Sequence, residues 1–443
     1  MSGRDLRRRV PVRELPASEA VKTFDEIVVG YTEDEAIQEA ARAVALGLGS
    51  LPGSCPFGVD IRSMVEQIAK GDFDAALELV LAAHPWPGVV GRQCRKEFNR
   101  APTLGPGADG VNLGALERAA ADFGVPPRPR FVPGAPTGRR VAVVGAGSAG
   151  SAAAWRLGAL GHDVTVLDQL PVPGGMMAVG YPDFRLPSSV VSHENDLASW
   201  GVDWNSGVRV DDQRFGELMH EFDATVVATG EFQPIALDIE GEDLAGVWPA
   251  LDFLTEFKLG GCPVVGEKIV VIGAGYTAQD ASRTCRRLGR EVSVFYRRGA
   301  GEMPLEPSLR KRHIARQVEE GAPYVFYVAP VRIVGQHGQV EAVEFVRCEP
   351  GPPDATGRPS VVPVARSNFE VACDTVLVAI GEEADLSYLS PLVGGGGLLV
   401  DPSGATPIPG VFAAGTIAGA RSTRDAFLSG LQVAGSINTY LGA

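Results

Sequence analysis

A strand–glycine loop–helix pattern that occurs twice is the feature that most constrains the fold of this chain. The first copy is VAVVGAGSAGSAAAWRLGALGHDVTVLD, and the second is IVVIGAGYTAQDASRTCRRLGREVSVFYRR. Each copy runs from an apolar strand through a glycine turn into a helix and on to a second strand. Such a turn brings backbone N–H groups and the positive end of a helix up to a pyrophosphate. Both copies therefore predict a dinucleotide site on a parallel sheet.

The first loop is a complete GxGxxG motif. Its first glycine permits the tight turn, its second lets the backbone approach the phosphates, and its third allows close packing of helix on strand. The second strand ends on an acid, where a carboxylate accepts hydrogen bonds from the hydroxyls of an adenosine ribose. We predict a flavin adenine dinucleotide (FAD) site whose contacts are Gly145, Gly147, Ser148, Ala149, Gly150 and Asp168.

The second loop differs at two positions. Ala278 replaces the third glycine, and the second strand ends in Tyr296-Arg297-Arg298 instead of an acid. Two arginines suit the 2′-phosphate of NADPH by charge and by bidentate geometry, although a solvated arginine pair is the alternative. We predict an NADPH site formed by Gly273, Gly275, Tyr276, Thr277, Ala278, Arg297 and Arg298. Two dinucleotides in one chain imply that a hydride passes from nicotinamide to flavin.

The pattern along the chain predicts an α/β protein of the two-dinucleotide-binding flavoprotein type behind an N-terminal α-helical domain. Helical periodicity dominates the first 130 residues, with Thr32 as an expected N-cap, and the Pro/Gly/Arg-rich stretch at 128–138 reads as a linker. We expect the helical domain at 1–130, the FAD domain at 139–260 and 375–443, and the NADPH domain at 261–374. The segment 375–443 is interpreted as chain that returns to complete the first dinucleotide domain.

Composition excludes several other classes of protein. The 443 residues carry a net charge of −14, which argues against broad binding of nucleic acid. No stretch approaches the length of apolar sequence that a membrane helix needs, and no secretory signal is recognisable, so we expect a cytoplasmic protein without membrane contact. The six cysteines form no CxxC pair, which disfavours a disulfide scaffold and a zinc ribbon. No metal site is predicted.

Several further motifs resemble the small (β) subunit of bacterial glutamate synthase and the related N-terminal half of dihydropyrimidine dehydrogenase. These motifs are PGGMMAVGYPDFRLPSSVV, VVATGEFQP, YRRGAGEMP and GVFAAGTIAG. The resemblance covers nearly the whole chain and implies FAD and NADPH domains. It adds to the FAD site Gly175, Met176, Arg185, Ala228, Thr229, Gly230, Gly415, Thr416, Ser422 and Thr423. It adds to the NADPH site Ala379, Ile380 and Gly381.

The cysteines depart from this resemblance. In the family, the helical domain carries two [4Fe–4S] clusters, and each cluster needs four thiolates or equivalent ligands. This chain reads EAARAVAL, with Ala43, Leu46 and Leu51 at the first three cysteine positions, so that only Cys55 remains. The second group reads GRQCRKEFNRAP, where Cys94 remains while Phe98 and Pro102 replace later cysteines. We therefore predict that no iron–sulfur cluster is present.

For each of three side chains near the predicted cofactors we expect a particular effect or role. Thr416 replaces the aspartate of the family's GGD motif, which is expected to weaken FAD binding without abolishing it. Tyr276 replaces an Asp or Asn of the family, and its ring either packs on the loop, which we favour, or covers the nicotinamide site. His193 is a candidate proton donor. Otherwise no side chain stands out as a catalytic acid or base.

The sequence thus predicts an NADPH oxidoreductase whose flavin passes electrons directly to a small-molecule acceptor or to a protein redox partner. The alternative is a degenerate, non-catalytic nucleotide-binding subunit that stabilises a partner protein, in line with Thr416 and the lost cysteines. The identity of the acceptor and the choice between a homo-oligomer and a hetero-oligomer stay open.

Overall fold

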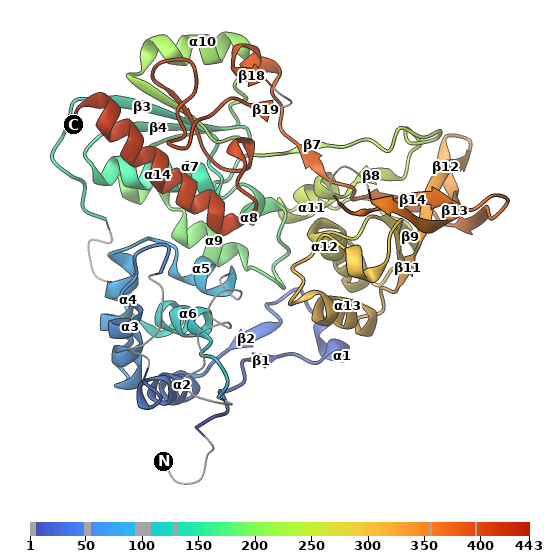
Figure 1. The fold of residues 1–443 in the computed structure, drawn as a ribbon, viewed down its shortest axis with the longest axis horizontal. Coiled ribbons are helices and arrows are strands. Elements are labelled where there is room, and N and C mark those ends of the chain that lie inside the picture. Colours follow the sequence, from blue (N-terminus) through green and yellow to red (C-terminus); the bar gives the residue numbers. More distant parts are fainter. Residues whose placement is uncertain (1–5, 48–54, 94–107, 127–130, 354–356, 395–396) are drawn as a thin grey trace.

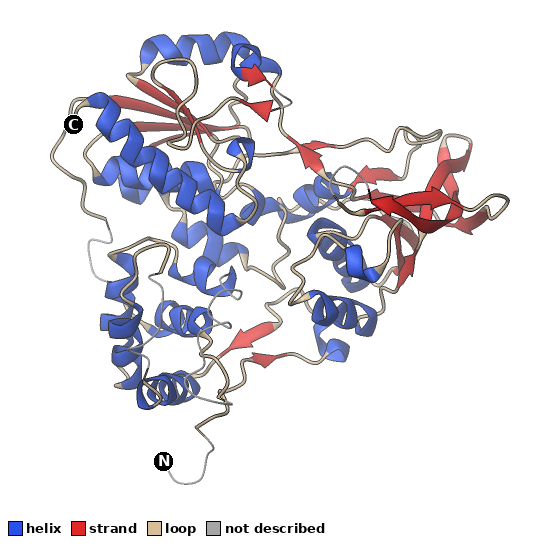
Figure 2. Ribbon diagram, in the orientation of Figure 1, coloured by secondary structure: helices blue, strands red, loops and turns tan. Residues whose placement is uncertain are grey.

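The computed structural model describes residues 6–47, 55–93, 108–126, 131–353, 357–394 and 397–443 (Figure 1). Three parts are distinguished by their secondary structure: a helical N-terminal part, a first parallel sheet, and a second parallel sheet that carries an antiparallel extension (Figure 2). The fold class predicted from the two glycine loops is confirmed by this architecture and by the comparisons given below.

The N-terminal part packs short amphipathic helices into one core. Thr32 caps the first long helix in a capping box, because its hydroxyl accepts from the N–H of Glu35 and the Glu35 carboxylate accepts from the N–H of Thr32. The elements are β1 (Arg13–Glu14), α1 (Ala17–Ala20), β2 (Val28–Gly30), α2 (Glu33–Ala45), α3 (Ile61–Ala69), α4 (Phe73–Leu81), α5 (Pro87–Gln93) and α6 (Leu113–Phe123).

The first sheet has five parallel strands in the order β20-β6-β3-β4-β5. Its central strands are continuous apolar runs, as expected of parallel strands that are covered on both faces. The elements are β3 (Arg140–Val144), α7 (Ser148–Ala159), β4 (Asp163–Asp168), α8 (Met176–Val179), α9 (Ser188–Glu194), a 3₁₀ turn (Leu197–Trp200), β5 (Asp203–Ser206), α10 (Asp212–Glu221), β6 (Ala224–Val227), a 3₁₀ turn (Ser387–Leu392), β18 (Val393–Gly394), β19 (Gly397–Leu398), β20 (Val411–Ala413), a 3₁₀ turn (Thr416–Ala418) and α14 (Thr423–Leu441).

Helices α7 and α14 lie side by side on one face of this sheet, and α10 covers the other face (Figure 1). The core beneath α7 and α14 continues into the helical part. Trp86 joins the two, because its ring packs on Phe427 at 4.4 Å between centroids and its indole N–H donates to Asn195 at 3.2 Å. The helical part is therefore fixed to the first sheet by a shared apolar core.

The second sheet has parallel strands in the order β11-β10-β9-β16-β8. Helices α11 and α12 cover one face, and the antiparallel strands β12, β13 and β15 cover the other. The elements are β8 (Val247–Pro249), α11 (Ala250–Lys258), β9 (Lys268–Ile272), α12 (Tyr276–Arg287), β10 (Glu291–Tyr296), a 3₁₀ turn (Ala300–Glu302), α13 (Arg310–Glu319), β11 (Tyr324–Phe326), β12 (Val328–Gln336), β13 (Gln339–Pro353), β14 (Pro359–Pro363), β15 (Phe369–Ala372) and β16 (Thr375–Val378).

One predicted assignment is wrong. The predicted place of the strand TVLVAIG is the first dinucleotide domain, but β16 pairs with β9 and β8 in the second sheet. Strand β8 and helix α11 also belong with the second sheet, although both lie within 139–260. The reason is physical: an apolar strand has the same pattern whichever sheet it enters. The true crossing points are two-residue strands, β7 (Gln233–Pro234) and β17 (Glu382–Glu383), which pair antiparallel between the sheets.

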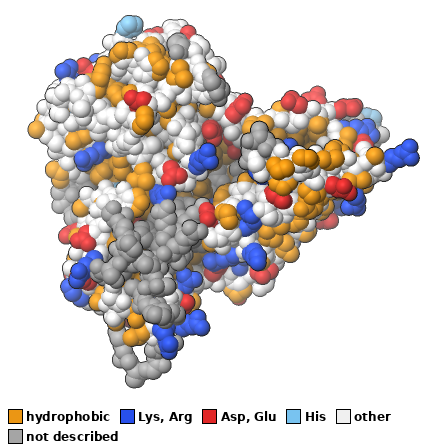
Figure 3. Space-filling model, viewed as in Figure 1, with side chains coloured by type: hydrophobic (Ala, Val, Ile, Leu, Met, Phe, Trp, Pro, Cys, Tyr) orange, Lys and Arg blue, Asp and Glu red, His pale blue; other side chains and the backbone are white. Residues whose placement is uncertain are grey.

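The N-terminal segment reaches across to the second sheet as well. The Arg287 guanidinium on α12 donates to the carbonyl of Thr23 at 2.9 Å, and Arg316 on α13 donates to the carbonyl of Leu15 at 2.8 Å. These contacts attach the N-terminal segment to helices α12 and α13. On the coloured part of the face in Figure 3, basic side chains are interspersed with acidic ones.

Candidate functional site

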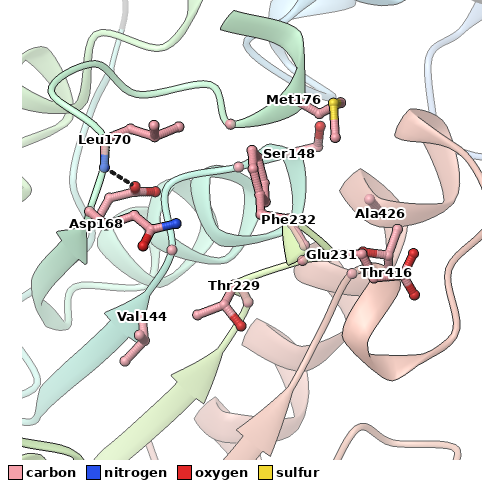
Figure 4. A pocket seen from close by; sticks show the side chains of 18 of the residues that line it. Val144, Ser148, Asp168, Leu170, Met176, Thr229, Glu231, Phe232, Thr416 and Ala426 are labelled. Carbon is pink, nitrogen blue, oxygen red and sulfur yellow. Dashed lines mark hydrogen bonds between the residues drawn. The ribbon is translucent and has the colours of Figure 1, made fainter. Parts of the chain in front are cut away.

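A cavity of about 310 Å³ opens at the carboxyl ends of the first sheet, beside the first glycine loop (Figure 4). This is where ligands bind in open parallel sheets. The cavity is lined by most of the residues predicted to contact FAD. They are Gly145, Gly147, Ser148, Ala149, Asp168, Gly175, Met176, Ala228, Thr229, Gly230, Gly415, Thr416, Ser422 and Thr423.

The first loop is held by close backbone packing. Gly145 has a φ of +102°, and a Cβ at this position would lie 2.4 Å from the carbonyl oxygen of Ala228. Gly150 does not line the cavity. A Cβ on Gly150 would lie 1.8 Å from the carbonyl oxygen of Gly145, so this residue lets α7 press against the turn. The third glycine therefore contributes to the site by allowing close helix packing, and not by lining the cavity.

Asp168 ends β4 and holds the loop through both carboxylate oxygens. One oxygen accepts from the N–H of Ala146 at 2.6 Å. The other accepts from the N–H of Leu170 at 2.7 Å, the bond drawn as a dashed line in Figure 4. Burial raises the pKa of Asp168, while these two N–H groups oppose the rise. Each oxygen keeps a second lone pair, so the carboxylate at the cavity wall is able to accept from a ribose hydroxyl.

Arg185 lies elsewhere than its predicted place. It is absent from the cavity lining and instead forms an ion pair with Asp280 on α12 of the second unit. Its guanidinium lies over the rings of Tyr181, at 4.6 Å, and of Tyr276, at 5.7 Å. Tyr181 lines the cavity and Tyr276 is the first residue of α12, after the second glycine loop, so Arg185 joins the regions of the two glycine loops. The motif signalled an important arginine but not its partner.

Other lining residues are not among the predicted contacts, although Tyr181 and Glu231 lie within the quoted motifs. Tyr388 donates to the Thr229 hydroxyl at 3.3 Å, and Arg209 donates to Asp385 at 2.8 Å. Arg209, Asp385 and Tyr388 come from segments without a motif. The lining residues that sequence analysis missed are Val144, Leu167, Gln169, Leu170, Tyr181, Val208, Arg209, Val210, Glu231, Phe232, Gln233, Glu382, Asp385, Tyr388, Arg421 and Ala426.

The second loop repeats the frame of the first. Gly273 has a φ of +123°, and a Cβ there would lie 2.1 Å from the carbonyl oxygen of Ala379. Ala278, at the third glycine position, is fully buried against the helices of this unit. The predicted residues Gly275, Tyr276 and Thr277 form the start of α12, and Ala379, Ile380 and Gly381 follow β16 at the same edge of the sheet. The structure thus brings these predicted residues together.

Tyr276 contacts the segment that follows β10. Its hydroxyl accepts from the N–H of Glu306 at 3.3 Å, and its ring meets His313 edge-on at 5.6 Å. The predicted arginine pair divides into two roles. Arg297 is exposed at the end of β10, whereas Arg298 is buried and its Nε donates to the carbonyl of Pro359 at 3.1 Å. Arg297 is therefore the better placed of the two for a phosphate.

The described residues of the helical part do not fit a four-thiolate cluster. Ala43 is fully buried in the apolar core, Leu46 packs against that core, and Cys55 is buried there too. Leu51, Cys94, Phe98 and Pro102 lie outside the described residues. Within the described ranges, no group of three or more His, Cys, Asp or Glu residues is arranged to hold a metal ion. His193 is exposed on α9 and is not part of the cavity lining.

No helix in the described part of the chain is long and apolar enough to cross a membrane.

Comparison with family models gives two matches. Residues 139–434 match the model described as pyridine nucleotide-disulphide oxidoreductase. Residues 20–126 match the model described as dihydropyrimidine dehydrogenase domain II, 4Fe-4S cluster. The helical part therefore resembles a cluster-bearing domain, although its described residues lack the ligands.

Individual relatives agree with the family models. The chain is 34% identical over 421 residues to the NADP(+)-dependent formate dehydrogenase subunit beta of Moorella thermoacetica, a match that covers 87% of this chain and 59% of the relative. It is 32% identical over 471 residues to the glutamate synthase [NADPH] small chain of Azospirillum brasilense, covering 98% and 95%. The chain spans about three-fifths of the length of the first curated relatives it matches.

A solved structure supports the fold alone. FprA of Mycobacterium tuberculosis, in complex with NADPH, superposes with a TM-score of 0.55 at 20% identity, covering 70% of this chain and 85% of FprA. The predicted resemblance to glutamate synthase small subunits and the predicted oxidoreductase class are confirmed by these comparisons. The chain belongs to the pyridine nucleotide-disulphide oxidoreductase family, and its relatives include the small chain of glutamate synthase.

Proposed function

We propose that the chain is an FAD-dependent NADPH oxidoreductase that passes electrons to a small-molecule acceptor or a redox partner without iron–sulfur clusters. One observation carries the proposal: two glycine loops of the same frame lie in joined units, one ending in buried Asp168 and the other in exposed Arg297. An acid suits a free ribose hydroxyl, while an arginine suits a 2′-phosphate. The first loop would hold FAD and the second NADPH.

The proposed FAD site consists of the predicted residues that line the cavity. Gly150 supports it by allowing α7 to pack closely on the glycine loop. When bound, flavin supplies the hydride acceptor. The chain's own residues bind and orient: backbone N–H groups at the start of α7 face the pyrophosphate position, and Asp168 accepts from the ribose. Thr416 supplies a hydroxyl where the family has a carboxylate, which leaves FAD binding weaker.

The proposed NADPH site consists of the second loop, Arg297 and the turn after β16. Arg298 supports β10 from within through its bond to the carbonyl of Pro359, and so does not contact the phosphate itself. We propose three units: a helical unit at 1–130, an FAD unit built on the first sheet, and an NADPH unit that includes β8, α11 and β16.

A protein partner is supported by the relatives that are named as subunits or chains of larger enzymes. The lost cysteine positions remove the electron route that the family model implies for the helical part. We therefore propose that reduced flavin gives its electrons directly to the acceptor.

An anaerobic titration tests the proposed function. The purified full chain, reconstituted with FAD, should show flavin absorbance that bleaches on addition of one equivalent of NADPH, and much less readily with NADH. Colourless protein that takes up no FAD, or flavin that NADPH leaves oxidised, would contradict the proposal and favour a non-catalytic subunit.

Iron and acid-labile sulfide analysis of anaerobically purified protein tests the missing clusters separately. We expect well under one iron per chain. Near-stoichiometric iron and sulfide would contradict the proposed absence of clusters, but would not contradict the proposed reaction of NADPH with flavin.

A further inference from the structure

Two glutamates occupy matching places at the ends of corresponding strands in the two sheets. Strand β6 leads into Ala228-Thr229-Gly230-Glu231, and β16 leads into Ala379-Ile380-Gly381-Glu382. Each of these strands pairs with the strand that precedes a glycine loop, β3 or β9. The two glutamates therefore follow equivalent turns on the two nucleotide sites.

The two-stranded crossing brings these turns together. Glu382 pairs with Pro234 in the β7–β17 ribbon, and the N–H of Ile235 donates to the carbonyl of Gly381 at 3.1 Å. As a result, Glu231 and Glu382 line the same cavity although 150 residues separate them in sequence. Glu231 points into that cavity after the Gly230 turn (Figure 4).

Glu382 also lies next to the second glycine loop, because the turn before it packs on that loop: a Cβ on Gly273 would lie 2.1 Å from the carbonyl oxygen of Ala379. It is thus a residue of the cavity lining that directly follows the turn packed on the second glycine loop. A hydride is transferred only between atoms in near contact, so the reacting rings of the two proposed cofactors would meet where the two sites adjoin.

The junction is rich in negative charge. Burial raises the pKa of Glu382, and the carboxylates of Glu231 and, more weakly, Asp252 raise it further, while the nearby Thr277 side chain opposes the rise. Burial likewise raises the pKa of Glu231. Two arginines line the same cavity, but Arg209 is paired with Asp385 and Arg421 is exposed. Within the described part of the chain, no ion pair is formed by Glu231 or Glu382.

Two carboxylates in one partly desolvated cavity are stabilised by a nearby cation. We propose that Glu382, together with Glu231 in the same cavity lining, is a specificity-determining residue that favours the cationic nicotinamide ring of NADP⁺ over the neutral dihydronicotinamide ring of NADPH. This inference rests on the proposed function. Loss of a hydride breaks the C4–H bond with both of its electrons and leaves the ring positive, while flavin accepts the hydride. The carboxylates thus favour hydride release.

Three probes separate ring charge from the rest of the dinucleotide. NADP⁺ has a cationic ring, 1,4,5,6-tetrahydro-NADP has a neutral ring that gives no hydride, and 2′,5′-ADP has no ring. We expect Glu382→Gln in the FAD-loaded full chain to weaken NADP⁺ binding by about tenfold, a Coulombic effect at an effective dielectric near 20, measured by calorimetry. The other two probes should change by less than about twofold, and Glu231→Gln should repeat the pattern more weakly.

Glu383→Gln is the matched control. Glu383 is the next residue of the same ribbon but is exposed, and it is not part of the cavity lining. Its substitution should leave the affinity for all three probes unchanged. Unchanged NADP⁺ affinity in both Glu382→Gln and Glu231→Gln, or an equal loss for all three probes, would overturn the inference.

The outcomes also distinguish this inference from the proposed function. If the wild-type chain binds none of the three probes, the proposed function and the inference fall together. If the wild-type chain binds NADP⁺ and its flavin is bleached by NADPH, but Glu382→Gln shows no selective loss, only the inference falls.

Discussion

The two glycine loops share one frame and differ where chemistry is needed. In both, the first glycine packs its backbone against the end of a neighbouring strand, at Ala228 in the first loop and at Ala379 in the second. The loops diverge at the third glycine position, Gly150 or Ala278, and at the end of the following strand, Asp168 or Tyr296. We infer that the shared loop geometry binds a dinucleotide, and that the residues at the divergent positions determine whether it is FAD or NADPH.

The divergence at the third position reflects how tightly the helix meets the turn. In the first loop a Cβ would overlap the carbonyl oxygen of Gly145, whereas in the second loop the methyl group of Ala278 is buried without expelling the helix. Helix α7 thus approaches its turn more closely than α12 does. At the strand end, Asp168 binds its own loop through two N–H groups, whereas Tyr296 donates to the carbonyl of Glu302 at 2.9 Å.

Gly150→Ala should have the largest effect. The added methyl group meets backbone that cannot rotate away, so α7 has to shift and the cavity wall shifts with it. We expect loss of nearly all bound flavin, measured as flavin per chain after purification with added FAD. The matched substitution Ala278→Gly should keep the flavin and cost about 1 kcal/mol of helix stability. Equal flavin content in both variants would show that the loops do not differ as described.

Asp168→Asn should come next. An amide group can accept at only one of its two terminal atoms, so the N–H of Ala146 or of Leu170 would lose its partner, and the negative charge toward the ribose would be lost. A lost charge-assisted bond costs about 1.5–3 kcal/mol, so FAD affinity should fall by about 100-fold. Tyr296→Phe, at the corresponding place, should leave FAD affinity unchanged. FAD binding that is unaffected in Asp168→Asn would contradict the role of the acid.

Arg297→Ser should lower kcat/KM for NADPH by about 30-fold, roughly 2 kcal/mol, through loss of one guanidinium–phosphate contact. The value for NADH should stay within about twofold because NADH lacks the 2′-phosphate. Lys311→Ser, an exposed basic residue on α13, is the charge-matched control. A parallel loss with both dinucleotides would assign Arg297 a structural role.

Thr416→Asp should tighten FAD binding by about tenfold, because a charged acceptor replaces a neutral hydroxyl at the cavity wall. Thr416→Val should weaken it. Flavin release on dilution measures both. If the aspartate weakens FAD as much as the valine does, the proposed match between this position and the family's carboxylate is wrong.

The smallest expected effect is a pH dependence of stability. Burial raises the pKa of folded Asp168 above the 3.8 of the unfolded chain. The folded state therefore binds this proton more tightly. The stabilisation that results is fully present below pH 3.8 and is lost as pH rises through the folded pKa. Urea unfolding of flavin-free protein should show this slope relative to Asp168→Asn, and parallel pH profiles would contradict it.

Much of this arrangement could be predicted from sequence because local rules govern it. A glycine turn between a buried strand and a helix leaves few alternatives, and Thr32 and Glu35 form a capping box within four residues. The predicted part of the cavity lining, which includes Gly145, Asp168 and Gly230, consists mostly of residues in the glycine loop and in turns that follow strands.

Contacts between distant segments could not be predicted in the same way. The ion pair of Arg185 with Asp280 joins two units, and no local pattern names the partner of an arginine. The sheet that β16 enters is decided by strand pairing and not by its own apolar residues. Arg297 and Arg298 are adjacent and carry the same charge, so the sequence does not distinguish them. In the fold, Arg297 is exposed and Arg298 is buried.

The most direct test of the central claim is a crystal structure of the full chain with FAD and NADP⁺. We predict density for the FAD adenosine beside Asp168 at the first loop, and for the NADP⁺ 2′-phosphate beside Arg297 at the second. The reverse assignment, or a 2′-phosphate bound away from Arg297, would contradict the account of how the two loops divide their roles.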